Sequence, residues 1–318
     1  MVTGMVPILT QHTKRTRSVA LATIALLVLL AGCGTGASAT TSGGRKTIVV
    51  TYSILGSLVS EAVGNLANVV VMIPNGSDPH DWEPSARDIE QLNGADLIVR
   101  NGLGLEGGMV DALNRAEKQG VATFVASDHV TVRTVGEGEG LPTGDPDQAV
   151  GAQDPHLWMD PLTMRDVMVA LGPVLIEHGI DASSGVANVV DGLNTLNQTV
   201  SAILAVVPAA DRKLVTGHES LGYFAQRYGF KLVGALIPSL TTQADVSAQQ
   251  LSQLAGKIRA ERVKAIFTEL GTPPQVAQSI GAETGVKVVD LATHNLPSNG
   301  DYSTFLIDNA KKIATALA

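Results

Sequence analysis

Short apolar segments that alternate with helical patterns constrain the fold of this chain most strongly. From Thr47 onward these segments are nearly continuous runs of Val, Ile, Leu and Ala. Such runs predict strands buried on both faces, as in parallel sheets covered by helices. We therefore predict an α/β fold with two parallel-sheet lobes. The expected strands are 47–51, 69–73, 95–100 and 121–126 in the first lobe, and 213–217, 230–236, 264–268 and 286–290 in the second.

One long helix is expected to join the two lobes. Apolar residues recur at helical spacing over 186–207, and no proline interrupts them before Pro208. A helix of this length is roughly 33 Å long and can run along both lobes. The predicted organisation is a first lobe at 47–185, the connecting helix at 186–207 and a second lobe at 208–318. Further helices are expected over 247–260, after Pro273 and over 302–317.

The amino terminus is typical of an export signal. Three basic residues precede an apolar run over 19–30, which is too short to span about 30 Å of hydrocarbon as a helix. Leu-Ala-Gly-Cys at 30–33 resembles a bacterial lipobox, which implies cleavage before Cys33 and acylation of that residue; a plain signal peptide is the alternative. We expect a signal peptide over 1–32, a flexible tether over 33–46, and an exported protein anchored to the outer face of the cell membrane.

Composition and charge exclude several classes of function. The formal net charge of the whole chain is −8. The first 32 residues contain basic residues but no acidic ones, so the rest of the chain has a larger negative net charge. An acidic body repels phosphate backbones, so no nucleic-acid partner is expected. Aromatic residues make up only 3%, which argues against stacking surfaces for bases or sugars. The single cysteine excludes a disulfide within a monomer and a Cys-rich zinc site.

A duplicated Asp-Pro-His motif is the strongest chemical signal. Asp78-Pro79-His80 and Asp154-Pro155-His156 are each followed, two residues after the histidine, by one of the two tryptophans. Proline has a fixed φ, so each histidine sits in a stiff loop that suits a rigid metal site. The preceding carboxylates can orient the imidazoles. Two unrelated turns are the alternative, since Asp-Pro often starts a turn.

The second lobe offers two further candidate ligands. His218 follows one apolar strand and Asp290 ends another. Both therefore fall at the carboxyl ends of strands, where open α/β sheets place their ligands. Each residue alone has a simpler interpretation as a helix cap or a turn residue.

The chain resembles the substrate-binding lipoproteins of zinc/manganese ABC importers, the metal-receptor family with a long interlobe helix. The similar stretches cover nearly everything after the tether: YSILGSL at 52–58, DPHDWEP at 78–84, ADLIVRNGLGLE at 95–106, DPHLWMDP at 154–161, KLVTGHESLGYFA at 213–225 and VKVVD at 286–290. The resemblance implies one divalent cation in the cleft between the lobes and an ABC-transporter permease as membrane partner. It also implies metal-ion transport, no enzymatic activity and, in our interpretation, a monomer.

Carried over from this family, the metal ligands are His80, His156, His218 and Asp290. Three imidazoles and one carboxylate form a closed site that suits Zn²⁺, whereas Mn²⁺ prefers more oxygen. Family members with glutamate at the position of His218 favour manganese, so Zn²⁺ is expected here, with Mn²⁺ as the alternative. Many zinc receptors carry a His-rich loop before the second motif, but 136–153 contains no histidine. His294 is the one serious rival ligand.

Two other functions compete with a metal receptor. An exported zinc-dependent hydrolase could use the same centre, with Glu219 as a base beside His218. Catalytic zinc usually keeps an open position for water, however, and four protein ligands fill the tetrahedron. A surface adhesin or non-metal receptor, with structural histidines, would leave the duplicated motif unexplained. Metal analysis of the purified protein discriminates among the three.

Overall fold

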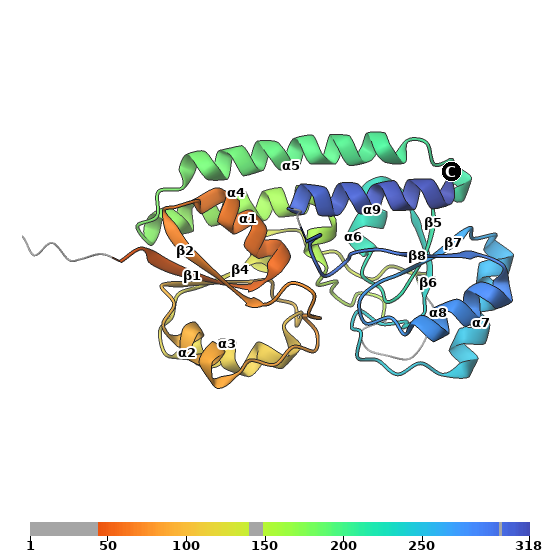
Figure 1. Ribbon diagram of the computed structural model, residues 1–318, viewed down its shortest axis with the longest axis horizontal. Coiled ribbons are helices and arrows are strands. Elements are labelled where there is room, and N and C mark those ends of the chain that lie inside the picture. The colour runs from red at the N-terminus through yellow and green to blue at the C-terminus, as the bar shows by residue number, and fades with distance from the viewer. Residues whose placement is uncertain (1–43, 140–148, 299–300) are drawn as a thin grey trace, which may run out of the picture. The chain divides into compact units, whose positions relative to one another are not determined.

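The fold is an α/β arrangement of two four-stranded parallel sheets, as the sequence predicts. The computed structural model describes residues 44–139, 149–298 and 301–318; Cys33, the predicted signal peptide and nearly all of the predicted tether lie outside these ranges. The strand orders are β2-β1-β3-β4 and β6-β5-β7-β8 (Figure 1). The strands are β1 (Lys46–Tyr52), β2 (Ala67–Ile73), β3 (Leu97–Arg100), β4 (Thr123–Val125), β5 (Lys213–Thr216), β6 (Lys231–Ala235), β7 (Ala265–Thr268) and β8 (Lys287–Asp290).

Helices flank both sheets (Figure 1). The first lobe contains α1 (Ser53–Val63), α2 (Ala86–Asn93), α3 (Val110–Lys118) and α4 (Pro161–Glu177). The second contains α6 (Gly222–Tyr228), α7 (Ala248–Glu261) and α8 (Pro274–Thr284). Central strand β1 is buried from Ile48 to Tyr52, because helices cover it and β2 and β3 pair with it. In the described ranges, no helix combines the length and apolar character needed to cross a membrane.

Helix α5 (Ser183–Leu204) joins the lobes, and the closing helix α9 (Tyr302–Leu317) lies along it (Figure 1). The buried residues of α5 form the stripe that the sequence predicts, from Val186 to Leu204. The helix begins at Ser183 rather than at 186, and it packs against α1, α4 and α9. Gly185 permits the close approach to α1, because a Cβ there would lie 1.9 Å from the Ala62 carbonyl oxygen.

Candidate metal centre

Four histidines from distant parts of the chain converge on one point. His80, His156, His218 and His294 each offer one ring nitrogen, and these four atoms all lie within 4.8 Å of one another. His156, His218 and His294 are 0%, 1% and 3% exposed, and His80 is the most exposed at 9%. Burying four imidazoles together is costly unless their nitrogens find partners, so the cluster is a candidate site for a cation.

Loops that follow strands bring three of the four histidines together, and the segment before α4 supplies His156. His80 lies in the loop after β2, and His218 comes two residues after β5. His294 follows β8, and His156 stands directly before a short 3₁₀ helix (Leu157–Met159) that leads into α4. Parallel strands present their carboxyl ends at one edge of a sheet, so loops from the facing edges of two sheets can share a site.

Asp290 does not join the histidines, contrary to the expectation from the sequence. It is an exposed residue at the end of β8, where its carboxylate accepts a hydrogen bond of 3.4 Å from the Thr268 hydroxyl. Four residues further along the chain, His294 enters the cluster instead. The cluster thus contains four imidazoles, and Asp290 lies outside it.

Two of the separations between these nitrogens are close to those of a tetrahedral zinc site. The Nε2 atoms of His80 and His156 are 3.4 Å apart, and those of His156 and His218 are 3.1 Å apart. Four nitrogens at about 2.0–2.1 Å from a tetrahedral ion lie about 3.3 Å from one another. These two separations lie close to that value, and all four nitrogens lie within 4.8 Å of one another, so the cluster has the dimensions of a site for one ion.

Asp154 orients His156, as the duplicated motif predicts. Its Oδ1 atom lies 2.8 Å from His156 Nδ1 and also accepts the His156 backbone N–H at 3.0 Å. An ionised carboxylate only accepts, so Nδ1 carries the proton and Nε2 keeps its lone pair for a metal. Arg133 donates to the other carboxylate oxygen at 3.0 Å and also pairs with Glu139. In the first motif, Asp78 instead accepts the backbone N–H of His80 at 3.0 Å.

Glu269 performs the same task for His218, although it was not among the residues predicted from the sequence. Its Oε1 atom lies 2.7 Å from both the backbone nitrogen and Nδ1 of His218, and its Oε2 atom accepts from Ser220 at 2.6 Å. Burial lowers the pKa of His218, but Glu269, together with the charges of Asp78 and Asp154, raises it above its ordinary value. Burial conversely favours neutral Glu269, but the hydrogen bonds and charge of His218 hold its pKa below the usual value.

The other three imidazoles resist protonation. Burial lowers the pKa of His80 and His294 well below 6.5, and the neighbouring rings lower it further. Burial also lowers the pKa of His156, although Asp154 partly opposes this. These three rings are therefore neutral near pH 7, the state in which an imidazole can bind a metal. His218 is the ring that takes up a proton first as the pH falls.

His294 presents a free nitrogen to the cluster. Its Nδ1 atom lies 2.9 Å from the Thr293 hydroxyl, while Nε2 is buried and has no hydrogen-bond partner among the described residues. The Trp158 indole N–H donates to the Thr293 carbonyl at 2.6 Å and thereby holds this loop against the first lobe. An orphaned buried nitrogen beside three other imidazoles is the environment that a metal ion satisfies.

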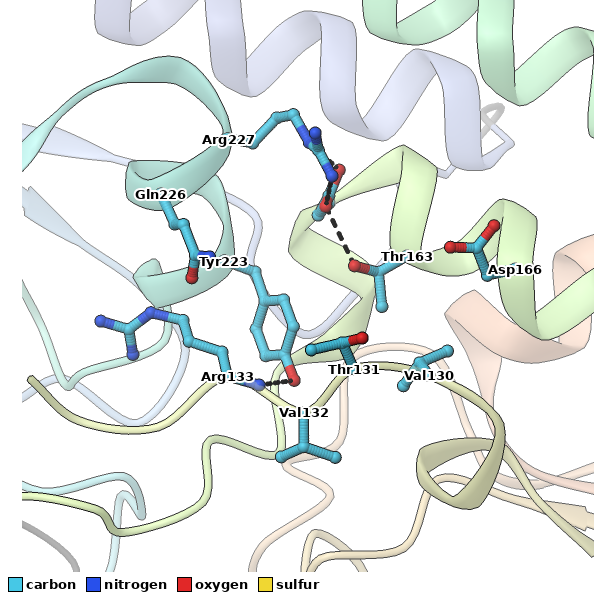
Figure 2. A pocket seen from close by; sticks show the side chains of 10 residues that line it. Val130, Thr131, Val132, Arg133, Thr163, Asp166, Tyr223, Gln226 and Arg227 are labelled. Atoms are coloured by element: carbon cyan, nitrogen blue, oxygen red, sulfur yellow. Dashed lines mark hydrogen bonds and ion pairs between the residues drawn. The ribbon is translucent and has the colours of Figure 1, made fainter.

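A separate cavity of about 350 Å³ lies between α4 and α6 (Figure 2). Tyr223 crosses it and accepts a hydrogen bond of 2.9 Å from the Arg133 backbone N–H. Arg227 lines the same cavity and pairs through two nitrogens with Asp160, the residue that caps α4. Arg133 and Arg227 are both already paired with carboxylates. The side chains that line this cavity therefore connect the two lobes and do not form a second charged site.

Comparison with known proteins gives matches along most of the chain. The family model described as the periplasmic component A of the zinc-uptake complex (ZnuA) matches residues 48–316. The manganese ABC transporter substrate-binding lipoprotein PsaA of Streptococcus pneumoniae is 26% identical over 323 aligned residues, covering 96% of this chain and 99% of that protein. The manganese-binding lipoprotein MntA of Bacillus subtilis is 26% identical over 244 residues, which is 76% of each chain.

Solved structures share the fold. The periplasmic zinc-binding protein TroA from Treponema pallidum is 24% identical with a TM-score of 0.73, and the match covers 86% of this chain and all of that one. A crystal structure of ZnuA is 24% identical with a TM-score of 0.72 over the same shares. The architecture of two parallel-sheet lobes is therefore common to these metal-binding proteins.

Proposed function

Because the chain belongs to the ZnuA family of periplasmic zinc-uptake components, we propose that it is the extracytoplasmic receptor that captures Zn²⁺ and delivers it to the permease of an ABC importer. As a member of this family it is a metal-binding, substrate-binding component of an ABC transporter. Three properties are our own proposals: the preference for zinc, the four ligands and the delivery to a permease.

The proposed ligands are the Nε2 atoms of His80, His156, His218 and His294. The convergence of these four rings is the single observation that carries the proposal. Each of two Nδ1 atoms lies against a carboxylate and a third against a hydroxyl, which leaves the Nε2 lone pairs for an ion. Four imidazoles also complete a tetrahedron without water, so the alternative of a hydrolase lacks the open position that catalytic zinc keeps.

Zinc is preferred over manganese in this proposal because all four ligands are nitrogens. Manganese suits carboxylate, carbonyl and water oxygens, whereas imidazole suits zinc. The relatives PsaA and MntA are named for manganese. The exclusion of Asp290 from the cluster makes this site poorer in oxygen than the sequence predicted, and that supports zinc for this chain.

Calorimetric titration of the metal-stripped protein tests both parts of the proposal. We expect one Zn²⁺ per chain and weaker binding of Mn²⁺ at the same pH. Hydrolytic activity of the zinc-loaded protein, or tighter binding of Mn²⁺ than of Zn²⁺, would refute the corresponding part. Delivery is tested by metal uptake in cells that carry or lack the gene, at limiting zinc.

We also propose that a lipid on Cys33 anchors the receptor to the outer face of the membrane. The relatives PsaA and MntA are named as lipoproteins, and the lipobox-like sequence supports the same assignment here. Cys33→Ala should release the protein from the membrane fraction or leave it unprocessed. A variant that still carries lipid would contradict this assignment.

A further inference from the structure

The segment Asn101–Gly108, which follows β3, contacts both metal-binding loops. We call it the β3 loop; its sequence is NGLGLEGG. It is part of the stretch that resembles the family, yet none of its residues belongs to the histidine cluster. Its contacts with the two Asp-Pro-His motifs indicate a role in holding them in place.

On one side, the β3 loop holds the second Asp-Pro-His motif. Asn101 is fully buried, and its side-chain amide donates at 2.8 Å to the carbonyl oxygen of Pro155, the residue before His156. The Tyr52 hydroxyl donates to the amide oxygen of Asn101 at 3.1 Å. Because both ends of this amide are engaged, Asn101 has one orientation and the Pro155 carbonyl has a fixed position.

The loop itself is held by a buried carboxyl group. Glu106 is fully buried, and one of its oxygens accepts from the Asn101 backbone at 2.6 Å and from the Thr51 hydroxyl at 2.8 Å. Thr51 belongs to the central strand β1. These hydrogen bonds connect the β3 loop to the most buried part of the first sheet and hold the loop rigidly.

On the other side, the β3 loop packs against the first Asp-Pro-His motif. A Cβ on Gly107 would lie 2.9 Å from the carbonyl oxygen of His80, and one on Gly108 would lie 2.4 Å from that of Trp82. Both contacts are with backbone, which cannot turn away as a side chain can. Glycine is therefore needed for this close approach.

We propose that the β3 loop sets the position of His80 relative to His156, with Asn101 and Gly108 as positioning residues for metal binding. This inference rests on the proposed function. Metal ligands must be held within about 0.5 Å of their productive geometry. An added methyl group on Gly108 would lie 2.4 Å from the Trp82 carbonyl oxygen and would force the two backbone segments apart to about 3.0 Å, a shift as large as that tolerance only two residues from His80.

The test compares Gly108→Ala and Asn101→Asp with the parent and with the control Gly192→Ala. Gly192 lies in α5, where an added Cβ would meet nothing within 4 Å. We expect the Zn²⁺ dissociation constant to rise about tenfold in the two β3-loop variants, as for other residues that support metal ligands. Gly192→Ala should bind as the parent does. Asn101→Asp keeps the acceptor for Tyr52 and removes the donor to Pro155.

A second measurement separates positioning from general stability. The visible absorption of Co²⁺-loaded protein reports the coordination geometry, and at saturating metal we expect it to change in Gly108→Ala. A lower melting temperature of the metal-free variants with unchanged dissociation constant and unchanged spectrum would overturn the inference, as would parent-like behaviour throughout. If Asn101→Asp does not fold, Gly108→Ala alone decides. Failure of the parent to bind one Zn²⁺ would instead refute the proposed function.

Discussion

The substitution Glu269→Gln tests what the negative charge of the carboxylate that holds His218 contributes to metal binding. Glu269 accepts three hydrogen bonds, two from His218 and one from Ser220, at 2.6–2.7 Å. Glutamine has nearly the same shape and can keep its oxygen toward His218, and the Ser220 hydroxyl can then accept from the new amide. The number of hydrogen bonds is preserved, so the change removes mainly the negative charge.

The expected loss of Zn²⁺ affinity is therefore about tenfold, the lower end of the range of 10–100-fold for residues that support metal ligands. A tenfold loss corresponds to about 1.4 kcal/mol. The loss arises because a charged acceptor makes the imidazole more basic and fixes its tautomer. Glu269→Ala should lose more, because it leaves two donors of His218 and one of Ser220 without their buried acceptor.

The sign of the pH dependence provides an independent check. In the metal-free parent, Glu269 raises the pKa of His218, so a proton competes with the metal as the pH falls. Glu269→Gln removes the main contribution that raises this pKa, while burial still lowers it, so proton competition is weaker. The affinity difference between parent and variant should be largest near pH 7.5 and should narrow toward pH 5.5.

Competition titration against a chromophoric chelator at several pH values measures both effects. Glu283→Gln serves as the matched control, because Glu283 is a carboxylate about half exposed that pairs with Arg259 away from the cluster. A dissociation constant within twofold of the parent at pH 7.5, or a difference that widens in acid, would show that the Glu269 charge does not support His218.

Three further predictions concern the ligands themselves. His294→Ala should weaken Zn²⁺ binding by about 100-fold or more while Asp290→Ala changes it little, and calorimetry of both variants checks the assignment; the reverse order would restore Asp290 as the ligand. His218→Glu should lower the ratio of Zn²⁺ to Mn²⁺ affinity, because carboxylate oxygen suits manganese, and an unchanged ratio in competition titration would contradict the role of His218. The metal-free protein should lose stability below about pH 6.5, because the burial-lowered pKa values of His80 and His294 mean that the unfolded chain binds more protons there. Zinc should accordingly raise the melting temperature less at pH 5.5 than at pH 7.5, and an equal rise at both would argue against histidine ligation.

The sheets were predictable because their signals are local. Each strand is a run of apolar residues bounded by polar or turn residues, and all eight appear with boundaries close to those predicted. Burial was less predictable at the sheet edges. Val71 in β2 and Val288 in β8 are 36% and 37% exposed although their runs read as fully buried. Edge position depends on strand order, which the individual runs do not encode.

The fourth histidine was hard to predict because long-range contacts determine the path of the chain after β8. The Ala292 backbone pairs with Asn309 of α9 through two hydrogen bonds of 2.6 and 3.0 Å. The Thr293 carbonyl accepts from Trp158, a residue of the first lobe. These contacts turn the chain inward and bring His294, rather than Asp290, to the centre. No local sequence pattern at 290–294 indicates contacts with residues so distant in the chain.

The position of Glu269 in the sequence could have marked it as a candidate site residue. It follows β7 directly, as Asp290 ends β8, and Thr268 and Asp290 are partners in the register of these two strands. The rule that ligands gather at the carboxyl ends of parallel strands therefore applied to both residues. The rule pointed to the correct edge of the sheet but did not distinguish a residue that holds a ligand from one that faces solvent.

Neighbours of the proposed ligands also connect the two lobes, which in our proposal links metal binding to lobe separation. Asp78 accepts the backbone N–H of His80 with one oxygen and the Thr242 hydroxyl of the second lobe with the other, at 2.6 Å. Trp158 stands two residues after His156 and donates to the carbonyl that precedes His294. The contacts that hold the lobes together therefore also hold the rings that bind the ion. If these rings bind the ion as proposed, a movement that separates the lobes would break these contacts and displace the rings, and lobe opening would then favour metal release.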